Sequence, residues 1–162
     1  VLTSVNMENT RFKKSSFKLN ETKDSFKAGE QLAKDLLADD LKYVFVLSDG
    51  LVVNGSRLVE GLNSVLNEKI NISGGLAGDN GDFIKTYVAD LENRFVSNCV
   101  TAIGFYGEHI LTESGSYGGW DSFGIDRTVT KSSENIVYEI DGKPALELYK
   151  SYLGDLASEL PG

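Results

Sequence analysis

An uninterrupted apolar run, Tyr43 to Leu47, is the feature that most limits what this chain can fold into. Its residues are aromatic, β-branched or aliphatic, and it is followed by Asp49-Gly50, a turn signal. A strand without polar alternation is typical of the interior of a sheet, where other layers cover both faces. The run therefore predicts a central strand over Lys42–Ser48 that is buried on both faces.

Helical and extended patterns alternate around this strand. Apolar spacing predicts one helix from about Asp24 to Ala38 and another from Asn54-Gly55-Ser56 to about Lys69. The apolar stretch Ile70–Ile72 then predicts a second strand. Strand, helix and strand in this order are typical of a β-α-β unit, in which ligands bind beyond the carboxyl ends of parallel strands.

Strand patterns dominate the remainder of the chain. The expected strands cover Phe12–Leu19, Ile84–Val88, Asn98–Tyr106, His109–Glu113 and Ile136–Ile140. Pro144 precedes an apolar helical face that ends at Gly154. Together these patterns predict a mixed α/β fold with a central mixed β-sheet flanked by helices.

The glycine-rich segment Ser73 to Thr86 is the first candidate for a binding site. Four glycines occur there within eight positions, with polar side chains around them. Glycine lets the backbone turn and lets a ligand approach peptide N–H groups closely. The segment predicts a bend that binds a small polar or zwitterionic ligand, its N–H groups taking a carboxylate and Asp79 or Asp49 taking an ammonium group. A tight turn without a ligand is the alternative.

Two further features complete the expected pocket. Asp49 ends the central strand, so the β-α-β rule places it at the same sheet edge as the glycine-rich segment. Trp120 and Phe123 lie in a second glycine-rich loop and would form an apolar wall, unless Trp120 plugs the core. The predicted ligand-binding residues are Asp49, Gly74, Gly75, Gly78, Asp79, Asn80, Thr86, Trp120 and Phe123.

The sequence lacks the residue patterns of phosphate-binding loops, calcium sites and catalytic sites. A Walker loop needs lysine and serine or threonine after its last glycine, whereas Asp79 follows Gly78. The alternating ligands of a calcium loop are absent, so we expect no metal and no cofactor. His109 is the only histidine and has no nucleophile elbow beside it, so we expect no catalytic residues and no enzyme. A hydrolase that uses Ser48 or Ser73 is the alternative.

Composition narrows the class of partner. The net charge is -8, and the 16 basic residues are spread along the chain, so we expect neither nucleic acid nor an anionic membrane surface. No apolar run approaches the roughly 18 residues of a membrane span. The single cysteine, Cys99, excludes an internal disulfide. These features favour a cytoplasmic domain with its own core.

Five segments together resemble the N-terminal half of the FIST domain, the F-box and intracellular signal transduction family. Gly-Gly-x-Ala-Gly-Asp and Asp-Gly-x-Pro-Ala-x-x-x-Tyr carry most of the likeness, which extends from about Lys42 to Gly154. The five segments are Tyr43–Gly50, Ser73–Asp79, Gly118–Trp120, Val129–Ser132 and Asp141–Tyr149.

The resemblance implies a bacterial, cytoplasmic sensory domain for signal transduction. Such a domain would bind a small molecule such as an amino acid and would act on an attached signalling output domain. The resemblance also implies that residues 1–154 are a partial FIST N-terminal domain and that 155–162 begin a linker to a C-terminal FIST half, which would complete the pocket. A protein-interaction or oligomerisation scaffold without a small ligand, with contacts through Phe12–Leu19 or the Trp120 loop, is the alternative.

Overall fold

A computed structural model describes residues 5–19, 24–67, 69–115, 117–119, 121–122 and 124–160 of the chain. The chain divides into two compact units, Val1–Gly115 and Ser116–Gly162. None of the helices in the described ranges has the length and apolar character needed to cross a membrane.

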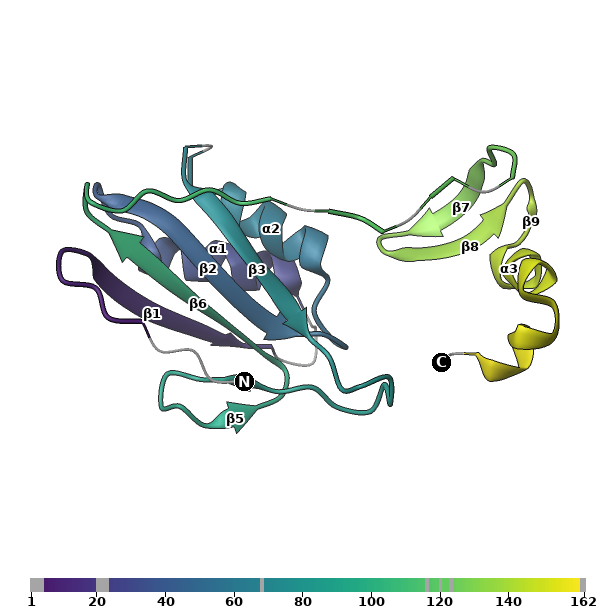
Figure 1. The fold of residues 1–162 in the computed structure, drawn as a ribbon, viewed down its shortest axis with the longest axis horizontal. Helices are drawn as coiled ribbons and strands as arrows, with labels where there is room; N and C mark the ends of the chain where they lie inside the picture. Colours follow the sequence, from purple (N-terminus) through teal and green to yellow (C-terminus); the bar gives the residue numbers. More distant parts are fainter. Residues whose placement is uncertain are drawn as a thin grey trace. The chain divides into compact units, whose positions relative to one another are not determined.

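The first unit is built on a four-stranded mixed sheet with the strand order β1-β6-β2-β3 (Figure 1). β2 and β3 are parallel, with Tyr43 opposite Asn71 and Asp49 opposite Ala77, as the β-α-β pattern predicts. β6 is antiparallel to both β1 and β2. The elements of this unit are β1 (Arg11–Lys18), α1 (Ser25–Leu36), β2 (Leu41–Asp49), α2 (Gly55–Asn63), β3 (Asn71–Ala77), β4 (Val88–Ala89), β5 (Phe95–Val96) and β6 (Cys99–Tyr106).

Helices α1 and α2 lie together on one face of this sheet (Figure 1). Each begins at a polar cap, since Asp24 accepts the Lys27 N–H at 2.9 Å and Asn54 accepts the Arg57 N–H at 3.2 Å. Gly29 is the point of closest approach, because a Cβ there would lie 2.2 Å from the Leu58 carbonyl oxygen. Glycine weakens an isolated helix, but here it lets the two helix backbones touch.

The core therefore lies between the helices and one face of the sheet. Val44, Val46 and Ser48 point from β2 into this layer and are buried. Leu47 on the other face of β2 is 44% exposed, so the prediction of a central strand holds while the prediction of burial on both faces is wrong. The main core residues are Ala28, Leu32, Ala33, Leu36, Val44, Leu58, Leu62, Val100, Ala102 and Tyr106.

The second unit is a small antiparallel sheet followed by a helix. Asp141 joins its strands, because its carboxylate accepts the Thr128 N–H at 2.9 Å and pairs with Arg127 at 2.9 Å. Gly154, with φ of 57°, ends the helix as predicted. The elements are β7 (Val129–Ser133), β8 (Ile136–Ile140), β9 (Lys143–Pro144), α3 (Ala145–Leu153) and a 3₁₀ turn η1 (Gly154–Glu159).

The glycine-rich segment differs from its prediction, because Ser73–Ala77 continues strand β3 instead of bending. A Cβ at Gly74 would lie 1.7 Å from the Val46 carbonyl oxygen, so glycine is required there by the neighbouring strand. The turn comes later, at Asn80 and Gly81, whose φ angles are 65° and 91°.

Two other predicted strands are wrong in the described part of the chain. Of the expected strand Ile84–Val88, only Val88 is paired, as the first residue of β4 (Val88–Ala89), because the residues before it are bound by a side chain, as described below. His109–Glu113 forms no ladder. The backbone there is bound from the side instead, since the Asn71 amide donates to the Thr112 carbonyl at 3.0 Å.

We expect Gly74→Ala to destabilise the first unit by about 2 kcal/mol, because the new methyl group overlaps the backbone of β2. Gly75→Ala is the matched control one residue along the same strand, since a Cβ there meets no atom within 4 Å. Its effect should stay within about 0.5 kcal/mol. Urea unfolding of both variants measures the difference, and equal midpoints would show that β3 does not run this close to β2.

Candidate functional site

Two cavities flank the carboxyl end of β2. Because successive side chains of a strand point to opposite faces, Ser48 and Asp49 contribute to different cavities. The Asp49 cavity has a volume of about 240 Å³ and is lined by Asp49, Leu51, Val52, Ile84, Lys85, Thr86, Ser97 and Asn98. The Ser48 cavity has a volume of about 200 Å³ and is lined by Val46, Ser48, Gly55, Leu58, Val59, Ile72, Ser73, Gly74, Gly75 and Leu76.

The Asp49 carboxylate connects three segments of the chain at the end of β2. One oxygen accepts the N–H groups of Leu51 at 2.9 Å and Val52 at 3.3 Å, which shapes the turn after the strand. The other accepts the Asn98 N–H at 2.8 Å, just before β6 begins. The buried Thr86 hydroxyl also donates to Asp49 and accepts the Gly50 N–H at 3.0 Å.

These hydrogen bonds determine the charge of Asp49. Its side chain is buried, and burial by itself raises the pKa of the carboxyl group. The hydrogen bonds from Thr86, Asn98, Leu51 and Val52 together outweigh burial and hold the pKa of Asp49 below its ordinary value. Asp49 is therefore a fixed negative charge at neutral pH.

Asp79 holds the loop that forms another side of the Asp49 cavity. Its carboxylate accepts the N–H groups of Phe83 at 3.1 Å, Ile84 at 2.7 Å and Lys85 at 3.0 Å. The bond from Ile84 is the main cause of a lowered pKa of Asp79. Because Ile84 and Lys85 line the Asp49 cavity, Asp79 acts on that cavity by holding their backbone.

The predicted site residues fall into separate groups. Asp49 and Thr86 line one cavity, whereas Gly74 and Gly75 line the Ser48 cavity. Gly78 and Asn80 are exposed at the turn after β3 and line neither of these two cavities, and Asp79 holds the loop. Trp120 and Phe123 lie outside the described residues.

Three polar residues of the Asp49 cavity were missed from the sequence, namely Lys85, Ser97 and Asn98. The Lys85 ammonium lies 5.2 Å from the centre of the Tyr87 ring. Among the described residues, none of these three side chains makes a hydrogen bond or ion pair, so their polar groups are free to meet a ligand. The sequence carried a signal for two of them, since Ser97 and Asn98 directly precede a strand pattern and asparagine is a residue type enriched at positive φ. In the structure the φ of Asn98 is 54°.

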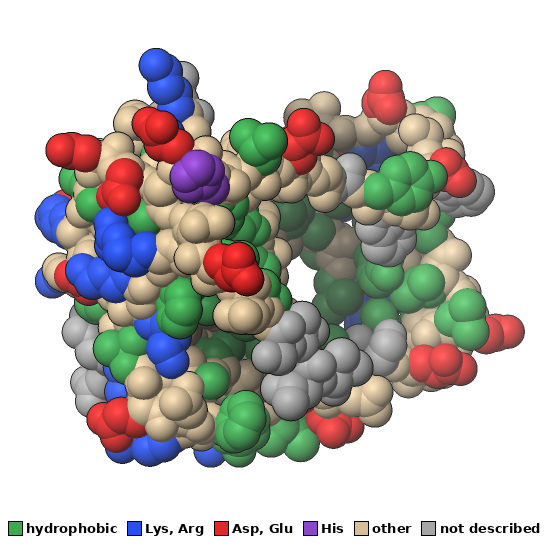
Figure 2. Space-filling model, turned by 60° about the vertical axis from the view of Figure 1, so that its left-hand side comes forward, with side chains coloured by type: hydrophobic (Ala, Val, Ile, Leu, Met, Phe, Trp, Pro, Cys, Tyr) green, Lys and Arg blue, Asp and Glu red, His purple; other side chains and the backbone are tan. Residues whose placement is uncertain are grey.

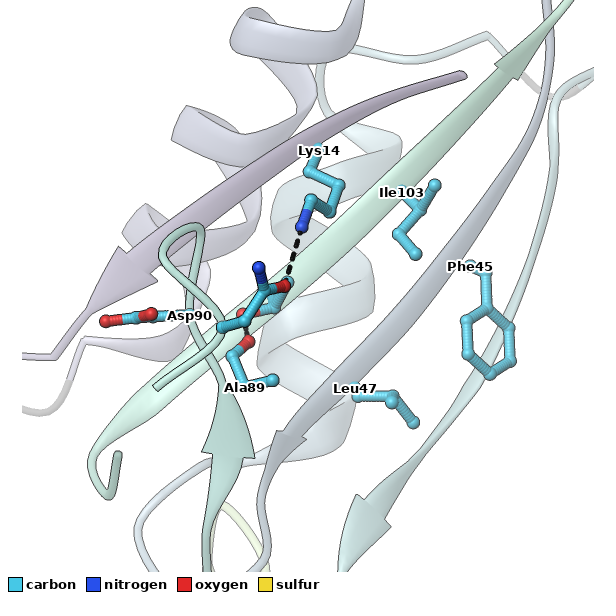
Figure 3. Close-up of a pocket in the computed structure, with 8 residues that line it drawn as sticks. Lys14, Phe45, Leu47, Ala89, Asp90 and Ile103 are labelled. Carbon is cyan, nitrogen blue, oxygen red and sulfur yellow. Dashed lines mark hydrogen bonds between the residues drawn. The ribbon is translucent and has the colours of Figure 1, made fainter. Parts of the chain in front are cut away.

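A third cavity, of about 240 Å³, lies on the sheet face opposite the helices (Figure 3). Phe45 and Leu47 from β2 and Ile103 from β6 line it, and Lys14 donates to the Asn93 amide oxygen at 3.1 Å at its rim. The cavity is largely apolar and open.

Asp90 borders this third cavity and is another loop acceptor. Its carboxylate binds the Arg94 guanidinium at 2.7 Å and accepts the Glu92 N–H at 2.9 Å. Arg94 is the main cause of a lowered pKa of Asp90. These contacts fix the turn between β4 and β5, because Glu92 and Arg94 both lie in it.

The residues suited to catalysis are not assembled in the described chain. His109 is exposed at the surface (purple in Figure 2), and burial raises the pKa of the Cys99 thiol. Ser73 bonds the Tyr43 hydroxyl at 2.5 Å, and the described residues offer Ser48 no hydrogen-bond partner and hence no base. The same residues contain no group of three His, Cys, Asp or Glu side chains placed to hold a metal ion.

Comparison with known families gives the class of this protein. The FIST N domain matches residues 1–143. The chain therefore belongs to the FIST N domain family, whose members are sensory domains of signalling proteins, as the resemblance of its five segments predicted. No curated protein and no solved structure matches the chain.

We expect Asp49→Asn to lower the free energy of unfolding by about 2–3 kcal/mol at pH 7, because charge-assisted hydrogen bonds are lost. The lowered pKa gives the pH dependence: the stabilisation is present above the unfolded pKa of about 3.9 and is lost as the pH falls through the folded value. The difference between wild type and variant should therefore shrink below about pH 4. Urea unfolding at pH 7 and pH 3.5 tests this, and a constant difference would contradict it.

Proposed function

We propose that the Asp49 cavity binds a small zwitterionic molecule such as an amino acid. The observation that carries the proposal is that one cavity of about 240 Å³ has both charges in its lining. The carboxylate of Asp49 lies at the end of β2, and the ammonium group of Lys85 lies in the loop that Asp79 holds. The volume suits a small molecule, and its position beyond the carboxyl end of β2 is where sheets of this kind bind ligands.

Each group has a distinct role in this proposal. The Lys85 ammonium binds the ligand carboxylate, and the Ser97 hydroxyl and Asn98 amide supply hydrogen bonds. Asp49 is already occupied by backbone N–H groups, so it attracts the ligand ammonium group through its charge instead of through a direct hydrogen bond. Leu51, Val52 and Ile84 contact the apolar part of the ligand.

Sensing follows from the loop that carries Lys85. Asp79 holds residues 79–85 in one arrangement, and a ligand that binds this arrangement more tightly raises its population. We propose that a C-terminal FIST half and a signalling output domain read that change, and that the domain works in the cytoplasm as a binding module and not as an enzyme. The free, buried Cys99 agrees with a reducing compartment.

We expect Lys85→Met to weaken binding of an amino acid at least tenfold, about 1.4 kcal/mol, because the ligand carboxylate loses its cation. A thermal-shift screen of the full protein against the free amino acids identifies the ligand, and calorimetry measures its affinity. Lys69→Met, at an exposed position away from the cavity lining, is the matched control and should bind normally. Equal affinity of the two variants for the amino acid would show that Lys85 does not bind the ligand.

The alternative is an interaction or oligomerisation scaffold without a small ligand, and one observation favours it. On the sheet face opposite the helices, Phe12 and Leu47 are exposed and Phe45 and Ile103 line an apolar cavity. Hydrophobic side chains gathered on one face mark contact surfaces. If this function holds, no amino acid raises the melting temperature, and Phe12→Asp lowers the association state measured by analytical ultracentrifugation without unfolding the protein.

A further inference from the structure

The Ser48 hydroxyl is the one buried side-chain polar atom without a hydrogen-bond partner among the described residues. Ser48 is 1% exposed, and its neighbours on the same face of β2 and β3 are apolar or glycine. A hydroxyl removed from water without a new partner destabilises a fold. Its position at the lining of a cavity suggests that the missing partner is brought by a ligand.

The Ser48 cavity has the dimensions and lining of a site for an aromatic molecule. Its volume is about 200 Å³, and an apolar cavity of about 150 Å³ holds benzene in another protein. Leu58 and Val59 from α2 and Ile72 from β3 form apolar walls. The cavity opens to solvent where Val59 and Leu76 are 42% and 53% exposed.

Close packing of β3 on β2 shapes this cavity. Gly74 presses its backbone against Val46, so no side chain from that position enters the space between the sheet and α2. Two serines line the cavity, Ser48 and Ser73. The Ser73 hydroxyl is bound to the Tyr43 hydroxyl, so the Ser48 hydroxyl is the one that remains for a ligand. The lining therefore offers many apolar contacts, and the Ser48 hydroxyl is its one buried side-chain polar group without a partner among the described residues.

We propose that the Ser48 cavity binds a small aromatic molecule that carries one hydrogen-bonding group, of the size of a phenol or an indole, and that the Ser48 hydroxyl recognises this group. The site lies on the other face of β2 from the Asp49 cavity and takes a different chemical class of ligand. It would let the domain respond to a second compound. The proposal does not depend on amino-acid binding at Lys85.

The test compares phenol with benzene, which has the same ring without the hydroxyl. We expect the full protein to bind phenol about tenfold more tightly than benzene, the contribution of one hydrogen bond to a buried partner. Amide shifts in a two-dimensional NMR titration should concentrate at Gly55, Leu58, Ile72 and Gly74. Equal affinity for the two compounds, or shifts elsewhere, would overturn the proposal.

Three variants complete the test. Ser48→Ala should bind phenol no better than benzene, and its free form should be as stable as wild type because no hydrogen bond is lost. Val59→Trp should weaken both compounds at least tenfold by filling the mouth of the cavity, while Lys69→Met should bind as wild type does. A clear drop in the melting temperature of free Ser48→Ala would show that Ser48 already has a partner, and the proposal would then be wrong.

Discussion

The arrangement of the first unit depends on one carboxylate at the end of one strand. Asp49 accepts N–H groups from the turn after β2 and from the segment before β6, and it binds the Thr86 hydroxyl. These segments are far apart in the chain but meet at the sheet edge. Because the hydrogen bonds outweigh the effect of burial, the charge persists at neutral pH, and the same group supports both the fold and the electrostatics of the Asp49 cavity.

The same device recurs in other loops of the protein. Asp79 and Asp90 each accept several backbone N–H groups of their own turns, Asp141 accepts the N–H of Thr128, and all three carboxyl groups have a lowered pKa. An ionised carboxylate can satisfy several N–H groups that no ladder or helix would pair. At least four of the 24 acidic residues, Asp49 included, thus bind the chain's own backbone. In the Asp49 cavity, Lys85 is the charged side chain without a hydrogen bond or ion pair among the described residues.

Glycine serves the opposite purpose, which is to bring backbones into contact. Gly29 lets α1 touch α2, and Gly74 lets β3 approach the carbonyl of Val46. In both places a methyl group would overlap main-chain atoms. The close packing of β3 on β2 also puts glycine, not a polar side chain, beside Ser48, which faces an apolar cavity.

The sequence by itself determined the central strand, both capped helices of the first unit, the parallel β2–β3 pair and the family. The reason is that apolar periodicity, caps and short motifs are properties of neighbouring residues. Only the tertiary structure decided that Ser73–Ala77 is a strand, since the reason for Gly74 is the carbonyl of Val46 in another strand. It also decided that Asp79 binds its own loop, that Asn98 meets Asp49, and that Ser48 has no partner in the described chain. Each of these depends on contacts between segments that are distant in sequence, which no local pattern records.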